Sequence, residues 1–215
     1  MGVRDLHAIV TAGPTHEPID PVRYIANRSS GKQGFAIAAT LAERGLRVTL
    51  IAGPVTLPTP EGVTRIDVET ALQMAAAVEA ALPADIAVMV AAVADWRVEA
   101  AGQKIKKDGS GAPPTITLVE NPDILAGLAK SPRRPKLLIG FAAETENVIE
   151  NAKAKLEKKG CDWIVGNDVS GDVMGGARNA VHLITHQGVE SWDEAEKGDV
   201  ARRITARVCD TMEGC

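Results

Sequence analysis

Lysine residues gather in two stretches where they could neutralise a polyphosphate. The stretch "KIKK" (104–107) places three ammonium groups, led by Lys104, in one loop next to a predicted strand end. Lys155 and Lys159 are four residues apart, so they share one face of a predicted helix. Ammonium groups placed in this way suit the charge of a nucleoside triphosphate. Solvated surface lysines would produce the same pattern.

Other residues could hold a nucleoside. Asp95 ends an apolar run and could accept a hydrogen bond from a sugar hydroxyl or a base amino group, or bind a metal. The tetrapeptide "NPDI" (121–124) predicts a helix start, with Asn121 as the cap and Pro122 in the first helical position. Such a start leaves N–H groups for an anion or a base edge. Phe141 follows a predicted strand and could stack on a base, although core packing would also explain it.

The stretch "NRSSGKQGFAIA" (27–38) opens a predicted helix. Ser29 or Ser30 is expected to cap this helix, while Gly31 and Gly34 let other backbone approach its first turn, where an anion is favoured. The stretch matches neither the GxxxxGK[ST] phosphate loop nor the GxGxxG dinucleotide pattern. A capped helix with packing glycines is therefore the competing interpretation.

The segment before this helix, residues 18–27, is longer than the usual connection of about 2 to 6 residues between a strand and a helix. We expect it to be a loop that carries Arg23 and Asn27 to the end of the sheet where ligands bind.

The elements that must position these residues alternate between short apolar runs and amphipathic runs of helical length. This alternation predicts an α/β fold, Rossmann-like, with a mostly parallel sheet and helices on both faces. Predicted strands span 7–13, 47–53, 85–95 (with its end loop), 136–145 and 162–168, and predicted helices span 31–45, 70–82, 121–130, 147–160 and 193–213. Residues 179–185, followed by "QGVES", predict a small antiparallel addition. The ligand is expected outside the carboxyl ends of the strands, where the strand order reverses.

The chain has 215 residues, of which 45% are hydrophobic, so we expect residues 1–215 to form one domain with a substantial core. Two loops rich in glycine and charge, at about 100–114 and 170–179, are expected to act as lids.

Composition and the absence of certain motifs argue against several classes of function. A net charge of −4 and a pI near 5.6 argue against nucleic acid and anionic membranes as partners. Three cysteines without CxxC spacing or a histidine cluster argue against a disulfide framework and a zinc site. No stretch approaches the roughly 20 apolar residues that span a bilayer, and we expect a cytoplasmic protein. Neither a Gly-x-Ser-x-Gly elbow nor an HExxH motif occurs, which argues against acyl-enzyme and zinc-hydrolase chemistry.

Taken in order, the motifs are more specific than any one of them. The run "ITAGPT.EPIDPVRYI.N.SSGK.GFAIA" (9–38, with unmatched positions as dots) resembles phosphopantothenate–cysteine ligases. The similarity continues through "LPTP" (57–60), "AAVAD" (91–95), "KIKK", "NPDI", "GFAAET" (140–145) and "NDVS" (167–170), and so covers almost the whole chain.

The resemblance implies a reaction in coenzyme A biosynthesis that joins 4'-phosphopantothenate to L-cysteine. CTP with Mg2+ would activate the carboxylate as an acyl-cytidylate, with loss of pyrophosphate; other branches of the family use ATP. The residues themselves do not decide between CTP and ATP, and they identify no metal ligands.

The resemblance also assigns roles to residues. Lys104 would neutralise the triphosphate and promote the first step, Asn27 would hydrogen-bond the acyl intermediate, and Arg23 would help to bind phosphopantothenate. The nucleotide-binding residues would be Met89, Val90, Ala91, Asp95, Lys104, Asn121, Pro122, Asp123, Ile124, Phe141, Lys155 and Lys159.

Such ligases are dimers, so the loop with Arg23 and Asn27 could complete a neighbour's site. In bacteria the activity is usually fused to a flavin-dependent decarboxylase. This chain starts at once with the first predicted strand, so we expect neither decarboxylase nor flavin from it.

Two other function classes remain open at this stage. The run "IVTAG" followed by a helix would suit an NAD(P)-linked oxidoreductase, although the missing GxGxxG argues against it. A non-catalytic nucleotide-binding protein would use "KIKK" and the glycine loops only to hold phosphates.

Overall fold

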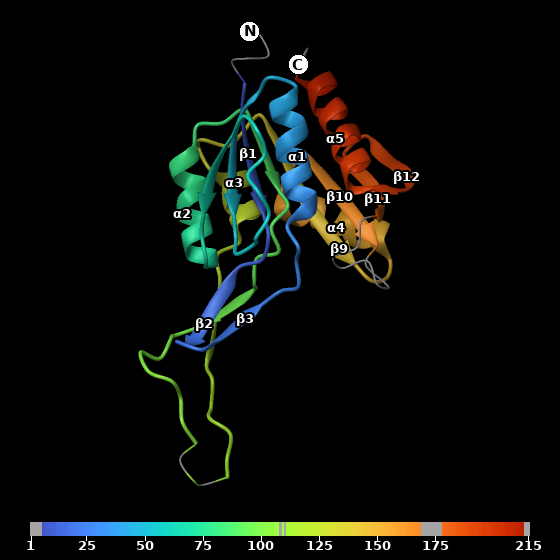
Figure 1. The fold of residues 1–215 in the computed structure, drawn as a ribbon. Helices are drawn as coiled ribbons and strands as arrows, with labels where there is room; N and C mark the ends of the chain where they lie inside the picture. The colour runs from blue at the N-terminus through green and yellow to red at the C-terminus, as the bar shows by residue number, and fades with distance from the viewer. Residues whose placement is uncertain (1–5, 108, 110, 169–177, 213–215) are drawn as a thin grey trace.

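A computed structural model describes residues 6–107, 109, 111–168 and 178–212, and it confirms the predicted α/β fold (Figure 1). Eight strands form one sheet in the order β12-β11-β10-β9-β6-β1-β4-β5. Neighbours from β10 to β5 are parallel, while β11 and β12 add the expected antiparallel pair. Among the described residues, none of the helices is long and apolar enough to cross a membrane.

The strands are β1 (His7–Ala12), β2 (His16–Asp20), β3 (Arg23–Ala26), β4 (Arg47–Ala52), β5 (Val63–Asp67), β6 (Ile86–Met89), β7 (Trp96–Val98), β8 (Leu118–Glu120), β9 (Leu137–Glu144), β10 (Trp163–Asp168), β11 (Arg178–Thr185) and β12 (Gly188–Glu196). The helices are α1 (Lys32–Glu43), α2 (Ala71–Ala81), α3 (Ile124–Lys130), α4 (Val148–Lys159) and α5 (Lys197–Thr211).

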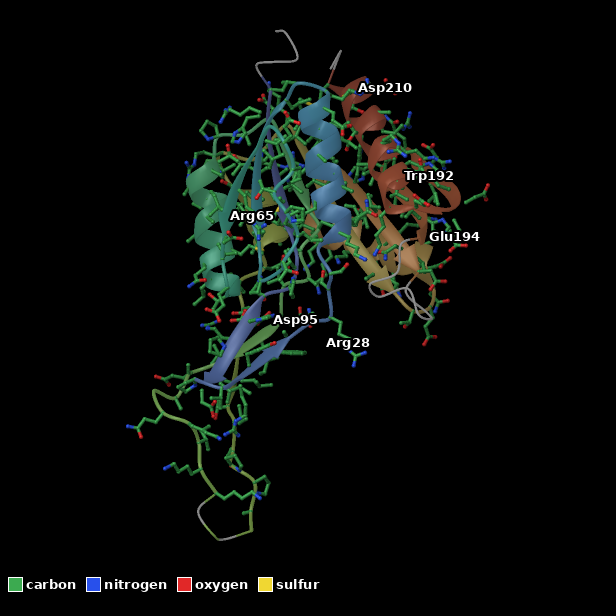
Figure 2. The ribbon with its side chains drawn as sticks, in the orientation of Figure 1. Arg28, Arg65, Asp95, Trp192, Glu194 and Asp210 are labelled. Carbon is green, nitrogen blue, oxygen red and sulfur yellow. The ribbon has the colours of Figure 1, made fainter. Side chains whose placement is uncertain are left out.

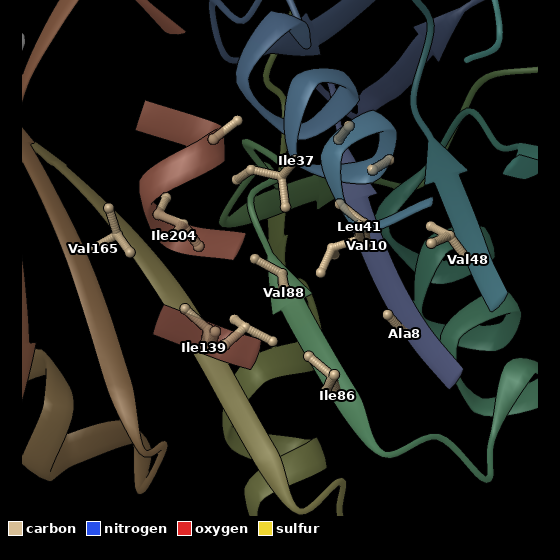
Figure 3. Packing of buried hydrophobic residues seen from close by; sticks show 14 of the residues in the cluster. Ala8, Val10, Ile37, Leu41, Val48, Ile86, Val88, Ile139, Val165 and Ile204 are labelled. Carbon is tan, nitrogen blue, oxygen red and sulfur yellow. The ribbon is translucent and has the colours of Figure 1, made fainter. Parts of the chain in front are cut away.

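Helices cover both faces of the sheet and divide the core in two. On one face α1 and α5 contribute Ile37, Leu41 and Ile204 to a cluster that also holds Val10 and Val88 of the sheet (Figure 3). On the other face α2, α3 and α4 pack their apolar side chains against residues that include Ile9. Successive strand residues point to opposite faces, so Ile9 and Val10 enter different clusters.

The point where the strand order reverses lies at β1. From β1 the chain crosses through α1 to β4 on one side, and β6 later returns to the other side of β1. The segments that follow β1 and β6 also stay paired with each other. The Ala92 N–H donates to the Gly13 carbonyl at 2.9 Å, and the Ala94 N–H donates to the Thr15 hydroxyl at 3.0 Å. The residues after β6 are therefore held rigidly at the place where α/β folds bind ligands.

The segment expected to be a plain loop before α1 is instead an antiparallel ribbon of β2 and β3. Tyr24 and Ile25 have high strand propensity, which favours an extended ribbon here. The ring of His16 stacks on that of Tyr24, with the two ring centroids 4.0 Å apart. A second short ribbon, β7 with β8, lies between β6 and α3 in sequence.

Residues 99–117 connect β7 to β8 without forming a helix or strand among the residues described there. Figure 1 shows this connection extending away from the sheet, past the β2–β3 ribbon. We call residues 99–117 the arm. It contains the expected lid loop at 100–114, whereas positions 170–177 of the other expected lid lie outside the described residues.

Several boundaries differ from the sequence-based expectation. The predicted helix at 193–213 begins only at Lys197, because Ala195 and Glu196 pair with β11 and extend β12. β5, which pairs with β4, is not among the predicted strands. The predicted serine cap of α1 is wrong: its N-cap residue is Gly31 in a left-handed conformation, at φ 73°, and no side chain caps it.

Candidate functional site

A cavity of about 1000 Å³ opens at the carboxyl ends of β1 and β6. Its walls come from the loop before α1, the segment after β6, the start of α3, the end of β9 and one side of α4. Asp95 and Arg28 mark its position in Figure 2, between the sheet and the β2–β3 ribbon. A cavity of this size can hold a nucleotide together with part of a second ligand.

Most of the residues predicted for the site share this cavity. The lining includes Asn27, Met89, Val90, Ala91, Asp95, Asn121, Pro122, Asp123, Ile124, Phe141, Lys155 and Lys159. Arg23 and Lys104 do not line it.

The Asn27 side chain lies beside the loop that follows β6. Its amide nitrogen donates a hydrogen bond of 3.0 Å to the carbonyl of Val93. Because that loop is itself paired with residues 13–15, the Asn27 amide has a defined position at the cavity wall. Asn27 can therefore present a hydrogen-bonding group to a ligand without first becoming ordered.

The "NPDI" segment is arranged differently from the predicted helix start. Asn121 is buried and does not cap α3; its side chain donates 2.9 Å to the carbonyl of Ala94, and its N–H donates 2.8 Å to the carbonyl of Asp95. The cap is Asp123, whose carboxylate accepts from the Ala126 N–H at 3.0 Å, and α3 begins at Ile124. Asn121 thus fixes the position of Asp95. The spacing of these residues in the sequence does not indicate this structural role.

Two lysines of α4, Lys155 and Lys159, form part of the cavity wall. Lys155 donates 2.7 Å to the carbonyl of Phe141, and Lys159 forms an ion pair with Asp123. Burial lowers the pKa of Lys155, as does the charge of Lys159, while Glu144 and Asp123 act in the other direction. Lys155 is therefore a partly desolvated ammonium group at the cavity wall, with which a phosphate could form a charge-assisted hydrogen bond.

The ion pair of Asp123 makes the free energy of unfolding depend on pH. Burial alone would raise the pKa of Asp123, but the contacts with Lys159 and the Ala126 N–H outweigh it, and the pKa is lowered. A carboxylate whose pKa is lower in the folded state stabilises the fold above its unfolded value of 3.8, and this contribution is lost as pH falls through the folded value.

We expect Asp123→Asn to retain the cap but to lower the free energy of unfolding at pH 7 by less than about 1 kcal/mol, because the pair is partly exposed. The difference from the unmodified chain should become smaller as pH falls below 3.8 and through the folded pKa of Asp123. Urea unfolding at a series of pH values from 7 downward measures it, with Asp193→Asn, an exposed carboxylate on β12, as the control. A difference that does not change with pH would contradict the assigned ion pair.

Arg23 and Lys104 are brought together at the base of the arm. Arg23 pairs with Asp20 at 3.0 Å and donates 2.8 Å to the carbonyl of Ile105, while the Ile105 N–H donates 3.1 Å to the same carboxylate. Burial opposes ionisation of Asp20, but its pKa is lowered by the N–H groups of Val22 and Ile105 and by Arg23. This clasp holds Lys104, the neighbour of Ile105, on the arm and outside the cavity of its own chain.

The cavity also holds residues that were not predicted for the site. They include Arg28, Lys32, Lys158, Asn167 and Lys197. Lys32 belongs to the "SSGK" stretch but was not chosen as the phosphate-binding lysine. Lys197 gave no signal in the sequence, because only tertiary packing brings the start of α5 to the start of α1.

Within the described part of the chain, His, Cys, Asp and Glu side chains form no group of three or more that could hold a metal ion.

Two relatives with similar sequences carry the same name. The chain is 51% identical over 191 residues to the coenzyme A biosynthesis bifunctional protein CoaBC of Escherichia coli (strain K12), covering 86% of this chain and 47% of the relative. It is 46% identical over 214 residues to the protein of the same name from Haemophilus influenzae, covering 98% of this chain and 53% of the relative. The chain therefore spans about half the length of the curated relatives it matches.

A solved structure agrees with the sequence comparison. The crystal structure of the C-terminal domain of the coenzyme A biosynthesis bifunctional protein CoaBC superposes with a TM-score of 0.80 at 36% identity, covering 97% of this chain and 96% of that one. Residues 3–212 match the family model described as the DNA/pantothenate metabolism flavoprotein C-terminal domain. This chain belongs to the family of DNA/pantothenate metabolism flavoprotein C-terminal domains.

Proposed function

We propose that residues 1–215 act as a single ligase domain that joins 4'-phosphopantothenate to L-cysteine with CTP, giving 4'-phosphopantothenoyl-L-cysteine. The observation that carries the proposal is the shared cavity, which gathers an aromatic ring, a carboxylate, an amide and several ammonium groups at the carboxyl edge of the sheet. The relatives are named for coenzyme A biosynthesis, to which this reaction belongs.

The nucleotide would occupy the part of the cavity between α3 and α4. Phe141 offers a ring face for the base, while Asp95 can accept hydrogen bonds from sugar hydroxyls or from the amino group of cytosine. Lys155 and Lys159 would hold phosphate oxygens. Lys159 must then exchange its present partner, Asp123, for phosphate.

In the first step a carboxylate oxygen of the acid attacks the α-phosphorus of CTP. The bond to the β-phosphate breaks, and pyrophosphate leaves with the electron pair, so the products are acyl-cytidylate and pyrophosphate. Negative charge grows on the phosphate oxygens in the transition state, and ammonium groups stabilise it there. No enzyme nucleophile is needed; positioning and positive charge are what the residues supply.

In the second step the amine of cysteine attacks the acyl carbon, CMP leaves, and the amine gives up a proton. Asn27 lies at the cavity wall beside the loop after β6, where its amide can hydrogen-bond the acyl group of the intermediate. An amide side chain can orient and stabilise this group through a hydrogen bond without adding a net charge to the site.

Magnesium suits this donor set. Mg2+ usually binds through one or two carboxylates together with substrate phosphates, and Asp95 is a carboxylate at the cavity wall. When bound, the ion would neutralise part of the triphosphate charge.

We further propose a homodimer in which the arm of one chain completes the cavity of the other. Lys104 is held outside the cavity of its own chain by the clasp of Asp20 and Arg23. Both ribbons and the end of the arm also expose large apolar side chains, which an interface would bury. These are Val22, Tyr24, Trp96, Ile116, Leu118 and Val119.

The remaining partners follow from the same reaction. A flavin-dependent decarboxylase would belong to the part of the relatives that this chain does not span, either fused to it or associated with it. We propose no flavin for this chain. Use of CTP would place the reaction in the cytoplasm, where nucleoside triphosphates are made.

The test is release of pyrophosphate from CTP by the purified chain, measured with and without 4'-phosphopantothenate, followed by mass analysis of the product with cysteine. We expect release to require the acid, and amide formation to require cysteine. No release with either CTP or ATP would refute a ligase. CTP binding without turnover in the full mixture would favour a nucleotide-binding protein, and binding of a nicotinamide cofactor would favour an oxidoreductase.

A further inference from the structure

Two lysines far apart in sequence meet at one wall of the cavity. Lys32 opens α1 and Lys197 opens α5, and both line the cavity. Their pairing is fixed by packing between the two helices: the Gln33 side chain donates 3.1 Å to the carbonyl of Lys197, and the hydroxyls of Thr40 and Thr205 lie 2.7 Å apart. The packing of the two helices therefore fixes the backbone positions of Lys32 and Lys197 at one wall of the cavity.

The two like charges are close enough to affect each other. Burial lowers the pKa of Lys197, and the positive charge of Lys32 lowers it further. Asp199, in the first turn of α5, is paired with Arg202. Like charges held together at a cavity wall are stabilised when an anion enters between them.

This pair is separate from the lysines assigned to the nucleotide. Lys155 and Lys159 lie on α4, which covers the same sheet face as α2 and α3, whereas α1 and α5 cover the opposite face. The two positive groups thus approach the carboxyl edge from opposite faces of the sheet. A triphosphate held on α4 would therefore lie on the other side of this edge from Lys32 and Lys197.

The geometry points to Lys32 and Lys197 as the binding site for the phosphate monoester at the far end of the acid substrate. This inference rests on the proposed function and names the part of the substrate that this wall recognises. A phosphate monoester carries a charge of about −1.5 to −2 at pH 7, which two ammonium groups match. The first turn of α1 adds backbone N–H groups on the same side.

The experiment measures binding and turnover with the acid in its phosphorylated and unphosphorylated forms. For Lys197→Gln we expect the KM for 4'-phosphopantothenate to rise by about 10-fold to 100-fold, while the KM for CTP stays within about twofold. Calorimetric titration of 4'-phosphopantothenate without CTP should show the same loss. Pantothenate, which lacks the phosphate, should bind the variant and the unmodified chain equally.

Three variants complete the design. Lys32→Gln should behave like Lys197→Gln, and Lys197→Arg should keep most of the affinity because it retains the charge. Lys153→Gln, an exposed lysine of α4 outside the cavity, is the matched control and should change neither KM. Thermal melting shows that each variant is folded.

A rise in the KM for CTP, with the KM for 4'-phosphopantothenate unchanged, would assign the pair to the nucleotide and overturn the inference. Unchanged constants for both substrates would also overturn it. In either case the unmodified chain would still be a ligase. If the unmodified chain neither binds nor uses 4'-phosphopantothenate, the proposed function itself fails.

Discussion

Replacing Lys104 with glutamine is expected to stop formation of acyl-cytidylate. Loss of one positive charge that stabilises the transition state lowers the rate by about 100-fold to 1000-fold. Asn27→Asp should have a different effect, because the first step remains possible while conversion to the amide is blocked. Rapid-quench analysis with CTP, the acid and cysteine should show no intermediate for Lys104→Gln and accumulated intermediate for Asn27→Asp. Equal and mild losses in both would refute these roles.

The same two variants test which subunit supplies Lys104. In a mixed dimer, the Lys104→Gln chain contributes an intact Asn27 cavity and the Asn27→Asp chain contributes an intact arm. If arms cross between subunits, that combination is one complete site. After random subunit exchange at equal amounts, about a quarter of all sites should regain full activity.

Each variant alone, taken through the same exchange, is the control and should stay inactive. Activity that fails to return in the mixture, while gel filtration shows dimers, would mean that Lys104 serves its own chain. The clasp at Ile105 would then have to open during the reaction.

Gly53→Ala is expected to be the most destabilising single-methyl change at the edge that carries the cavity. A Cβ atom at Gly53 would lie 1.7 Å from the carbonyl oxygen of Pro14 and 2.8 Å from its carbonyl carbon. Because the obstacle is backbone, no side chain can rotate to relieve the overlap. We expect a loss of about 3 kcal/mol in the free energy of unfolding, which is roughly 6 to 12 °C in Tm for a chain of this size.

Gly102→Ala on the arm is the matched control, since its added Cβ would meet nothing within 4 Å. Its Tm should change by no more than about 2 °C. The Gly53 variant should also bind CTP more weakly, because Pro14 forms a bridge with Ala92 in the cavity wall. Equal Tm values for the two variants would contradict the close approach seen in the structure.

Much of the fold could be predicted from the sequence because it depends on local patterns. Strand β1 and helix α2 are examples: a run of apolar residues marks the first, and Thr70 with Gln73 forms a capping box at the start of the second. The parallel sheet and its ligand edge follow from the alternation of such elements.

The elements that were not predicted depend on contacts between distant residues. β12 continues to Glu196 only because β11 pairs with it, although "DEAEK" has the composition of a helix start. The role of Asn121 depends on the carbonyls of Ala94 and Asp95, so its spacing from Pro122 wrongly indicated a helix cap.

The site residues also divide into those that local sequence patterns predict and those that depend on contacts between distant residues. Asp95, in the loop after β6, and Phe141, in the carboxyl-terminal half of β9, could be placed at the cavity from the sheet pattern alone. Lys197 could not, since it follows no predicted strand and reaches the cavity only through the packing of α5 on α1. Lys104 lies outside the cavity of its own chain because Asp20 and Arg23 hold the neighbouring Ile105. Neither the segment with Asp20 and Arg23 nor the "KIKK" stretch reveals this contact when it is considered alone.

The cavity wall draws on residues from Thr11 to Lys197, which is most of the chain. During synthesis on a ribosome, β1 and α1 leave the exit tunnel long before α5 does. The nascent chain can form part of its sheet early, but the wall between α1 and α5 stays open until translation is nearly complete. A chain truncated just before α5 therefore contains every strand of the sheet but no complete binding cavity.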